Sequence, residues 1–455
     1  MQYFRFRAVI KVKTIINNVS DMKRLFLFAT LAAALMGCSK SSDDPEPDPD
    51  DEVINMLPET RAVELTQEQR SFVDQNMDFS FNLFRAVNQI ADSKKSSILS
   101  PISVTYVMGM LNDGAAGQTA KEITSVLGFG EDNSKAVNEF CKALIEQAPK
   151  IDPSVTLEIA NTVIANKKLD VKFESQYEKN MNDYYSAEIS RLDFSKQTDA
   201  LKEINGWCNK KTHGMIPEIL KAGELSPSAL LVLMNAIYFK ATWTEKFNVA
   251  DTRTETFTTQ SGQKKSMPMM HRKAAACYGG NDVCTMLNLP YGSGNKWSMN
   301  ILLPNEGKTV NDVINSLSKT TWQELTYYKN TWDPIVDIKI PRFTTEFETD
   351  LISPLSNLGA PTMFIPRQAE FPNISTNYKK DLYVSLMKQK AAIEVSEEGT
   401  KASAVTIAVM DMACYIPPIQ ERPMNVDFHC NRPFVYIIQE SSTGAIFFLG
   451  TYRGE

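Results

Sequence analysis

The chain has 455 residues, of which 43% are hydrophobic and 22% are charged, a balance that is typical of soluble globular proteins. Its formal net charge is −6, and much of the negative charge lies in the acidic residues 43–52. The rest of the chain is only weakly acidic and has no basic stripe, which argues against nucleic acid as a partner.

The N-terminus carries an apolar run from Leu25 to Met36, directly after Lys23 and Arg24. A run of about a dozen residues is too short to span a bilayer. A basic region followed by a short apolar run and a small residue is typical of a secretory signal. We therefore expect a signal peptide at residues 1–37, with Met22 as an alternative start. A buried core helix is the alternative interpretation.

The apolar run ends in Leu35-Met36-Gly37-Cys38, which resembles the lipobox of bacterial lipoproteins, in which Cys38 would be lipidated. Residues 38–60 are acidic and rich in proline, so they cannot bury apolar surface and should form an extended linker. This linker resembles the acidic segment of some surface lipoproteins of Gram-negative bacteria. The resemblance implies an exported lipoprotein at the outer membrane, on the cell surface or in the extracellular space, with the lipid anchor as its only membrane contact.

Residues 61–455 are expected to form a single domain of the α+β class, with N-terminal helices packed on antiparallel sheets. Helical spacing dominates to about Ile219, and Thr66 with Gln69 resembles a capping box before the first helix. The sequence Gly-Ser-Gly-Asn at residues 292–295 predicts a hairpin turn. Strands are predicted at residues 230–238, 297–303, 335–340, 391–395 and 435–438.

The sequence contains none of the common motifs of enzymes. Its three histidines, His213, His271 and His429, form no HExxH motif and have no metal-ligand spacing. No GxSxG, Walker or GxGxxG motif is present. The seven cysteines form no CxxC pair, and we expect most of them to be free or buried small hydrophobes. These observations predict a protein that is not an enzyme and that needs no metal or cofactor, although a dispersed acid–base site would leave no such motif.

The most informative segment runs from Glu397 to Tyr415. From Thr400 to Ala413, the residues of one alternating side are all small or apolar, whereas the other side carries both charged residues of this stretch, Lys401 and Asp411. The small side consists of Thr400, Ala402, Ala404, Thr406, Ala408, Met410 and Met412. Gly399 and the prolines from Pro417 onward bound the segment like a loop. The pattern alone fits a permanent strand or an alanine-rich helix at least as well as a loop that can enter a sheet.

The beginning of this segment resembles the hinge of inhibitory serpins, a family of protease inhibitors. The hinge residues are Glu397, Glu398, Gly399, Thr400, Lys401, Ala402, Ser403 and Ala404. Residues 428–436 closely resemble the C-terminal signature of the family. Further matches occur in family order at residues 100–104, 114–119, 205–214, 233–243, 289–291, 301–304 and 341–343. From about residue 70 to its end, the chain is therefore similar to a serpin, which implies the serpin fold with an exposed reactive-centre loop.

The resemblance implies a suicide mechanism. A target protease attacks the exposed loop and forms a covalent acyl-enzyme, and the cleaved loop then enters the main sheet as a new strand and distorts the protease. The implied partner is a serine endopeptidase, with papain-like cysteine proteases as an alternative, and the inhibitor is expected to be a monomer. A non-inhibitory binding protein with the serpin fold is the alternative function. The small hinge residue Thr400 favours inhibition.

Family spacing from Gly399 places the scissile bond at Ala413–Cys414. The alternatives are Met410–Asp411, Met412–Ala413 and Cys414–Tyr415. The small or unbranched residues before these bonds imply an elastase-like or subtilisin-like target. A trypsin-like target is disfavoured, because such proteases require Arg or Lys before the bond.

The resemblance also marks the region in which the main sheet would open. At the position where the family usually has a histidine, this chain has Gln389, which still offers a donor and an acceptor. Its expected polar neighbours are Ser100, Ser103 and Asn235. Where the hinge begins, we expect an ion pair between Glu397 and Arg342, with Trp243 beneath it.

Overall fold

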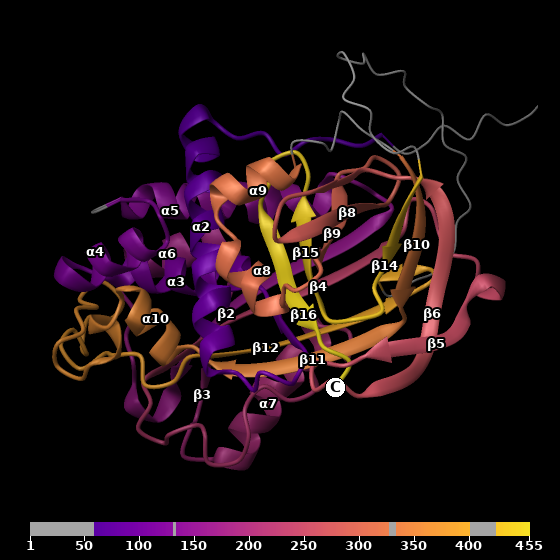
Figure 1. Cartoon of the computed structure of the whole chain (residues 1–455). Coiled ribbons are helices and arrows are strands. Elements are labelled where there is room, and N and C mark those ends of the chain that lie inside the picture. Colours follow the sequence, from indigo (N-terminus) through magenta and orange to yellow (C-terminus); the bar gives the residue numbers. More distant parts are fainter. Residues whose placement is uncertain (1–58, 131–132, 327–333, 401–424) are drawn as a thin grey trace, which may run out of the picture. The chain divides into compact units, whose positions relative to one another are not determined.

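Helices make up most of the N-terminal part of the fold (Figure 1). The computed structural model describes residues 59–130, 133–326, 334–400 and 425–455, so the predicted signal peptide and Cys38 lie outside the described residues. The predicted capping box is confirmed, because Gln69 N donates to Thr66 Oγ1 at 3.1 Å and Thr66 N donates to Gln69 Oε1 at 3.0 Å. The helices are α2 (Gln67–Ile90), α3 (Pro101–Gly114), α4 (Gly117–Val126), α5 (Ser134–Gln147), α6 (Ser175–Tyr185), α7 (Gln197–Lys211), α8 (Val310–Ser316), α9 (Lys319–Thr326) and α10 (Ile352–Leu358).

We call one of the six-stranded sheets of the fold the main sheet. Its strands follow the order β11-β12-β13-β4-β2-β3. They are β11 (Phe343–Asp350), β12 (Lys388–Ser396), β13 (Gly399–Thr400), β4 (Leu231–Thr242), β2 (Val155–Asn166) and β3 (Ala187–Leu192). All neighbours are antiparallel except β2 and β3, which run parallel.

Two further sheets complete the β structure. A six-stranded sheet has the order β1-β16-β15-β9-β8-β7, and a four-stranded sheet has the order β14-β10-β6-β5. The first contains β1 (Ser97–Leu99), β16 (Ile446–Tyr452), β15 (Phe434–Glu440), β9 (Trp297–Pro304), β8 (Cys284–Tyr291) and β7 (Tyr278–Gly280). The second contains β14 (Asn425–His429), β10 (Ile335–Pro341), β6 (Lys264–Ala275) and β5 (Arg253–Thr258).

Most of the predicted β structure is confirmed, as is the α+β class. Four of the five predicted strands lie within β9, β10, β12 or β15, the fifth begins one residue before β4, and residues 292–295 lie between the antiparallel strands β8 and β9. The expectation of helices up to about Ile219 is wrong at β2 and β3. The first four residues of β2 alternate between buried and exposed, as a strand requires, but its last six residues are all buried and lose this alternation.

Helices cover both faces of the main sheet at its strands β2 and β4. On the inner face, Ser103 of α3 donates to Asn235 of β4. On the outer face, Ile204 of α7 and the nearby Phe194 join a small apolar cluster that includes Ile164 of β2. Met234 of β4 packs against this cluster, so Met234 and its neighbour Asn235 face different helices, as the alternation of a strand requires.

No helix among the described residues has the length and apolar character that crossing a bilayer would require.

The apolar core gives a first prediction. Trp297 is 1% exposed and its ring centroid lies 4.8 Å from that of Phe447. We expect Trp297→Ala to destabilise the fold by about 3–5 kcal/mol, because a cavity remains where the ring was. Val249 is 61% exposed, so the control Val249→Ala should be nearly neutral. Thermal denaturation of both variants tests this, and equal midpoints would contradict the core assignment.

Candidate functional site at an open strand position

The strands β12 and β4 flank a strand position that is only partly filled. Gly399 and Thr400 form β13, in which Thr400 pairs with Val395 of β12 on one side and with Ala241 of β4 on the other. Beyond Thr400, the described parts of β12 and β4 share no pairing with each other. Among the described residues, two therefore occupy this strand position of the main sheet, and the position continues past them.

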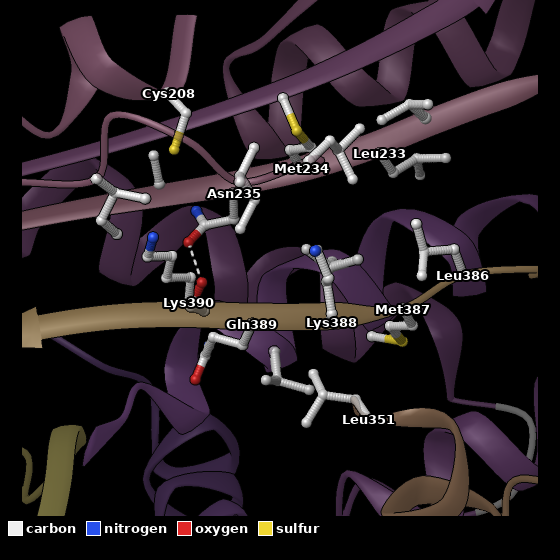
Figure 2. A pocket seen from close by; sticks show the side chains of 18 of the residues that line it. Cys208, Leu233, Met234, Asn235, Leu351, Leu386, Met387, Lys388, Gln389 and Lys390 are labelled. Carbon is white, nitrogen blue, oxygen red and sulfur yellow. Dashed lines mark hydrogen bonds between the residues drawn. The ribbon is translucent and has the colours of Figure 1, made fainter. Parts of the chain in front are cut away.

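A cavity of about 410 Å³ occupies the continuation of this position. Figure 2 shows Leu233, Met234 and Asn235 of β4 on one side of it and Met387 to Lys390 on the other. Residues 231–235 are all only half-buried, although β4 is an interior strand of the sheet. Such exposure is expected where the neighbouring strand is missing, because the facing edge is then uncovered.

Gly399 is required by the close approach of the two backbones at the entrance. Its φ is +136°, which favours glycine, and a Cβ atom there would lie 2.2 Å from the carbonyl oxygen of Ala241. No side chain can be accommodated at that distance. The glycine thus allows the chain to turn from β12 into the strand position beside β4.

Thr400 is held inside the sheet by an aromatic pair. Its side chain is buried, and its hydroxyl lies 2.8 Å from that of Tyr291. Burial raises the pKa of Tyr291 well above its ordinary value, so this hydroxyl keeps its proton. The Tyr291 ring stacks on Trp243 with centroids 4.4 Å apart, and Trp243 Nε1 donates to the carbonyl oxygen of Ser396 at 2.9 Å.

The ion pair predicted at the start of the hinge is confirmed. Arg342 Nε donates to Glu397 Oε2 at 3.0 Å, its Nη2 donates to Oε1, and Thr252 Oγ1 donates to Oε1 at 2.6 Å. The Glu397 side chain is 5% exposed. Burial by itself would raise the pKa of Glu397, but the hydrogen bonds from Arg342 and Thr252 hold it below its ordinary value. Trp243 lies next to this pair, since its backbone N donates to the carbonyl oxygen of Glu398.

The predicted sheet-opening residues form two separate contacts. Gln389 makes two hydrogen bonds of 2.9 Å with the backbone of Ser100, accepting from its N–H and donating to its carbonyl. Ser103 instead donates to Asn235, the contact drawn as a dashed line in Figure 2. Gln389 thus ties β12 to the residue that precedes α3, whereas Asn235 ties β4 to the first turn of the same helix.

Several residues of the site were not predicted. Asn161 of β2 accepts a 2.8 Å hydrogen bond from Asn235, and Tyr291 comes from a different sheet. Lys388 is 7% exposed and bonds Glu224 at 2.6 Å and Glu348 at 3.1 Å, at the far end of the open position. No spacing in the sequence relates Lys388 to Glu224 and Glu348, or Tyr291 to Thr400.

The remaining predicted site residues lie outside the described part of the chain. They are Lys401, Ala402, Ser403, Ala404, Met410, Met412, Ala413, Cys414 and Tyr415. Their proposed roles stay predictions.

The described histidines and cysteines do not form a nucleophile–base pair. His429 bonds Asp337, whereas the adjacent Cys430 is fully buried. Burial raises the pKa of the Cys430 thiol well above its ordinary value and that of Cys208 to about 11. Such thiols stay protonated near neutral pH and are poor nucleophiles.

Comparison with known proteins agrees with this geometry. Residues 74–453 match the family model described as "Serpin (serine protease inhibitor)". The chain is similar to Serpin B6 of Pongo abelii, with 31% identity over 83% of this chain and 97% of that protein. It is also similar to the leukocyte elastase inhibitor of Xenopus tropicalis, with 33% identity over 82% of this chain and 97% of that protein.

Solved structures agree as well. The chain is similar to the thermophilic serpin Tengpin in its native state, with 27% identity, a TM-score of 0.74 and coverage of 86% of this chain and 95% of that chain. It is similar to thyroxine-binding globulin in complex with thyroxine, with 26% identity, a TM-score of 0.72 and coverage of 84% and 99%.

The ion pair at the entrance predicts a pH dependence. Glu397→Gln should cost about 1 kcal/mol at neutral pH, because Arg342 is 45% exposed and water screens the pair. Since the folded-state pKa of Glu397 lies below its ordinary value of 4.5, its stabilisation is complete above that pH and is lost as the pH falls through the folded-state pKa. The melting temperatures of wild type and Glu397→Gln should therefore converge in acid.

Differential scanning calorimetry between about pH 3 and pH 7 measures this convergence. Glu139→Gln is the control, because Glu139 forms only a solvent-exposed pair with Lys135. A constant gap between wild type and Glu397→Gln across this range would contradict the assignment.

Proposed function

The chain belongs to the serpin family, and on this basis we propose that it inhibits serine endopeptidases as a suicide substrate. The open strand position between β12 and β4 is the observation that supports the proposal most directly. Two residues of the hinge already occupy that position. Leukocyte elastase inhibitors are among its relatives, which agrees with a target of this class.

The register of β13 says where further residues of the segment would go on insertion. Continuing the pairing of Thr400 residue by residue places Ala402 between Ile393 and Phe239. It then places Thr406 between Gln389 and Asn235, and Met410 opposite Leu231 at the end of β4. The available position thus holds about ten more residues, in line with strand geometry.

The side-chain pattern of the segment suits this register. Residues an even number of positions after Thr400 would share its buried face, because side chains alternate along a strand. Those residues are Ala402, Ala404, Thr406, Ala408 and Met410, all small or apolar. Thr406 would bring its hydroxyl between Gln389 and Asn235, the polar residues that border the position.

The proposed reaction begins as ordinary proteolysis. The serine hydroxyl of the target attacks the carbonyl carbon of Ala413, and an ester forms as the Ala413–Cys414 bond breaks and Cys414 leaves as a new amino terminus. Insertion then carries the ester-linked protease along the sheet before water can hydrolyse the ester. The driving force is the completed strand, since each new backbone hydrogen bond contributes about 1 kcal/mol and the uncovered apolar residues of β4 are buried.

The bonds Met410–Asp411, Met412–Ala413 and Cys414–Tyr415 are the alternatives to Ala413–Cys414. The unbranched and small residues before these bonds suit an elastase-like or subtilisin-like protease.

We further propose export as a lipoprotein attached through Cys38, which metabolic labelling with palmitate would test against Cys38→Ser.

A second candidate function is the binding of a small apolar molecule. The cavity of about 410 Å³ favours it, together with the similarity to thyroxine-binding globulin. The two functions differ in one observable, because only an inhibitor forms a complex with a protease that survives denaturing electrophoresis.

Thr406→Arg should convert the inhibitor into a substrate. On insertion its guanidinium would lie unpaired in the sheet between Gln389 and Asn235, which costs several kcal/mol and opposes insertion. With an elastase-like protease, the band of the covalent complex should fall at least about tenfold and be replaced by the cleaved chain. Thr406→Ser keeps the hydroxyl and should still form the complex. If Thr406→Arg trapped the protease as well as wild type, the insertion mechanism would be wrong.

Mass spectrometry of the peptide released from that complex tests the register. We expect a peptide that begins at Cys414 and ends at the C-terminus of the chain. A peptide that begins at Asp411, Ala413 or Tyr415 would select one of the alternative bonds instead.

A further inference from the structure

Two of the three histidines converge on one carboxylate, far from the open strand position. His271 of β6 and His429 of β14 both reach Asp337 of β10, at 2.5 Å to Oδ1 and 2.8 Å to Oδ2 respectively. The histidines come from distant parts of the sequence, and the four-stranded sheet brings them together. For this reason their spacing in the sequence gave no indication of a metal site.

The register of the sheet explains the convergence. Asp337 lies opposite Asp427 of β14, and Lys339, two residues further along β10, lies opposite both His271 and His429. All five residues therefore share one face of the sheet. Lys339 bonds Glu255 at 2.9 and 3.0 Å, so its charge is already compensated.

The pairing of Asp337 with Asp427 is unfavourable by itself, although the exposed Lys273 of β6 lies opposite Asp337 on its other side. Like charges on facing residues of neighbouring strands destabilise a sheet. Asp427 is exposed and the Asp337 side chain is 27% exposed, so a cation from solvent can reach both carboxylates. One ligand atom each of Asp337, Asp427 and His429 lie within 4.8 Å of one another.

We propose that Asp337, Asp427 and His429 bind a divalent transition-metal ion of the Zn²⁺ class, with His271 as a positioning residue. A set of one imidazole and two carboxylates suits Zn²⁺ better than Ca²⁺ or Mg²⁺, which prefer oxygen ligands alone. Binding would require each ligand atom to lie roughly 2.0–2.2 Å from a Zn²⁺ ion. His271 holds the second oxygen of Asp337, as histidine–carboxylate partners do around metal sites.

The ion would join β14 to β10. In the described chain β14 is an edge strand that pairs with β10 alone, and it follows directly after residues 401–424. A metal bridge between the two strands makes the detachment of β14 more costly, because the ion binds only the attached state. This inference does not depend on the proposed inhibitory function.

Isothermal titration with Zn²⁺ tests the site on the whole chain. Wild type should bind one equivalent, and Asp427→Asn and His429→Asn should abolish this binding. His213→Asn is the matched control, because the third histidine pairs with Glu158 elsewhere and should leave binding unchanged. His271→Asn should keep the binding but weaken it about 10- to 100-fold, as expected for a residue that acts through Asp337.

Two further measurements distinguish metal binding at this site from metal binding by cysteine thiolates. The Co²⁺ complex should show d–d absorption without the charge-transfer band of a thiolate ligand, and Zn²⁺ should raise the melting temperature of wild type but not of Asp427→Asn. The proposal is wrong if wild type binds no Zn²⁺ or if a thiolate band appears. It is equally wrong if His213→Asn and His429→Asn lose binding alike.

Discussion

The unfilled part of the strand position between β12 and β4 is the constraint on which the rest of the structure depends. Two strands of one sheet that face each other without pairing leave backbone donors and acceptors for which water must substitute. The polar contacts around the position can be understood from this condition. Gln389 fastens β12 to the backbone of Ser100, and Asn235 fastens β4 to Ser103, so the helix layer holds both strands beside the open position, while β11 and β2 pair with their other edges.

At the entrance of the strand position, Thr400 makes a buried contact and Glu397 makes an ion pair that is screened by solvent. Thr400 is fully committed to the sheet, because it pairs on both sides and meets Tyr291 in the core. Glu397, three residues earlier, faces a half-exposed Arg342. Solvent screening keeps such a pair weak compared with the buried contacts. In the proposed inhibition, the turn around Gly399 would therefore stay fixed while the residues after Thr400 enter the sheet.

Sequence reasoning predicted part of this site through resemblance to a family. The Glu397–Arg342 pair and the contact of Gln389 with Ser100 were predicted in this way. The contact of Tyr291 with Thr400 could not be predicted, because it joins two sheets. The strand β2 was assigned to a helical region although its first residues alternate, because its last six residues are all buried and lose the alternation that identifies a strand. The convergence of His271 and His429 depends on pairing between distant strands, which no spacing reveals.

The residues on either side of the segment 401–424 belong to different sheets. In the proposed mechanism, this arrangement favours insertion after cleavage over insertion of the intact chain. The preceding residue, Thr400, lies in the main sheet, whereas the following residue, Asn425, begins β14 at the edge of the four-stranded sheet. An intact segment must satisfy both anchors, so it can extend β13 only as far as its length allows. Cleavage removes the second anchor from the first part of the segment, while β14 keeps its pairing with β10. Any interaction that strengthens β14 on β10, including a bridging metal ion, therefore opposes insertion of the intact chain and leaves insertion of the cleaved chain unaffected.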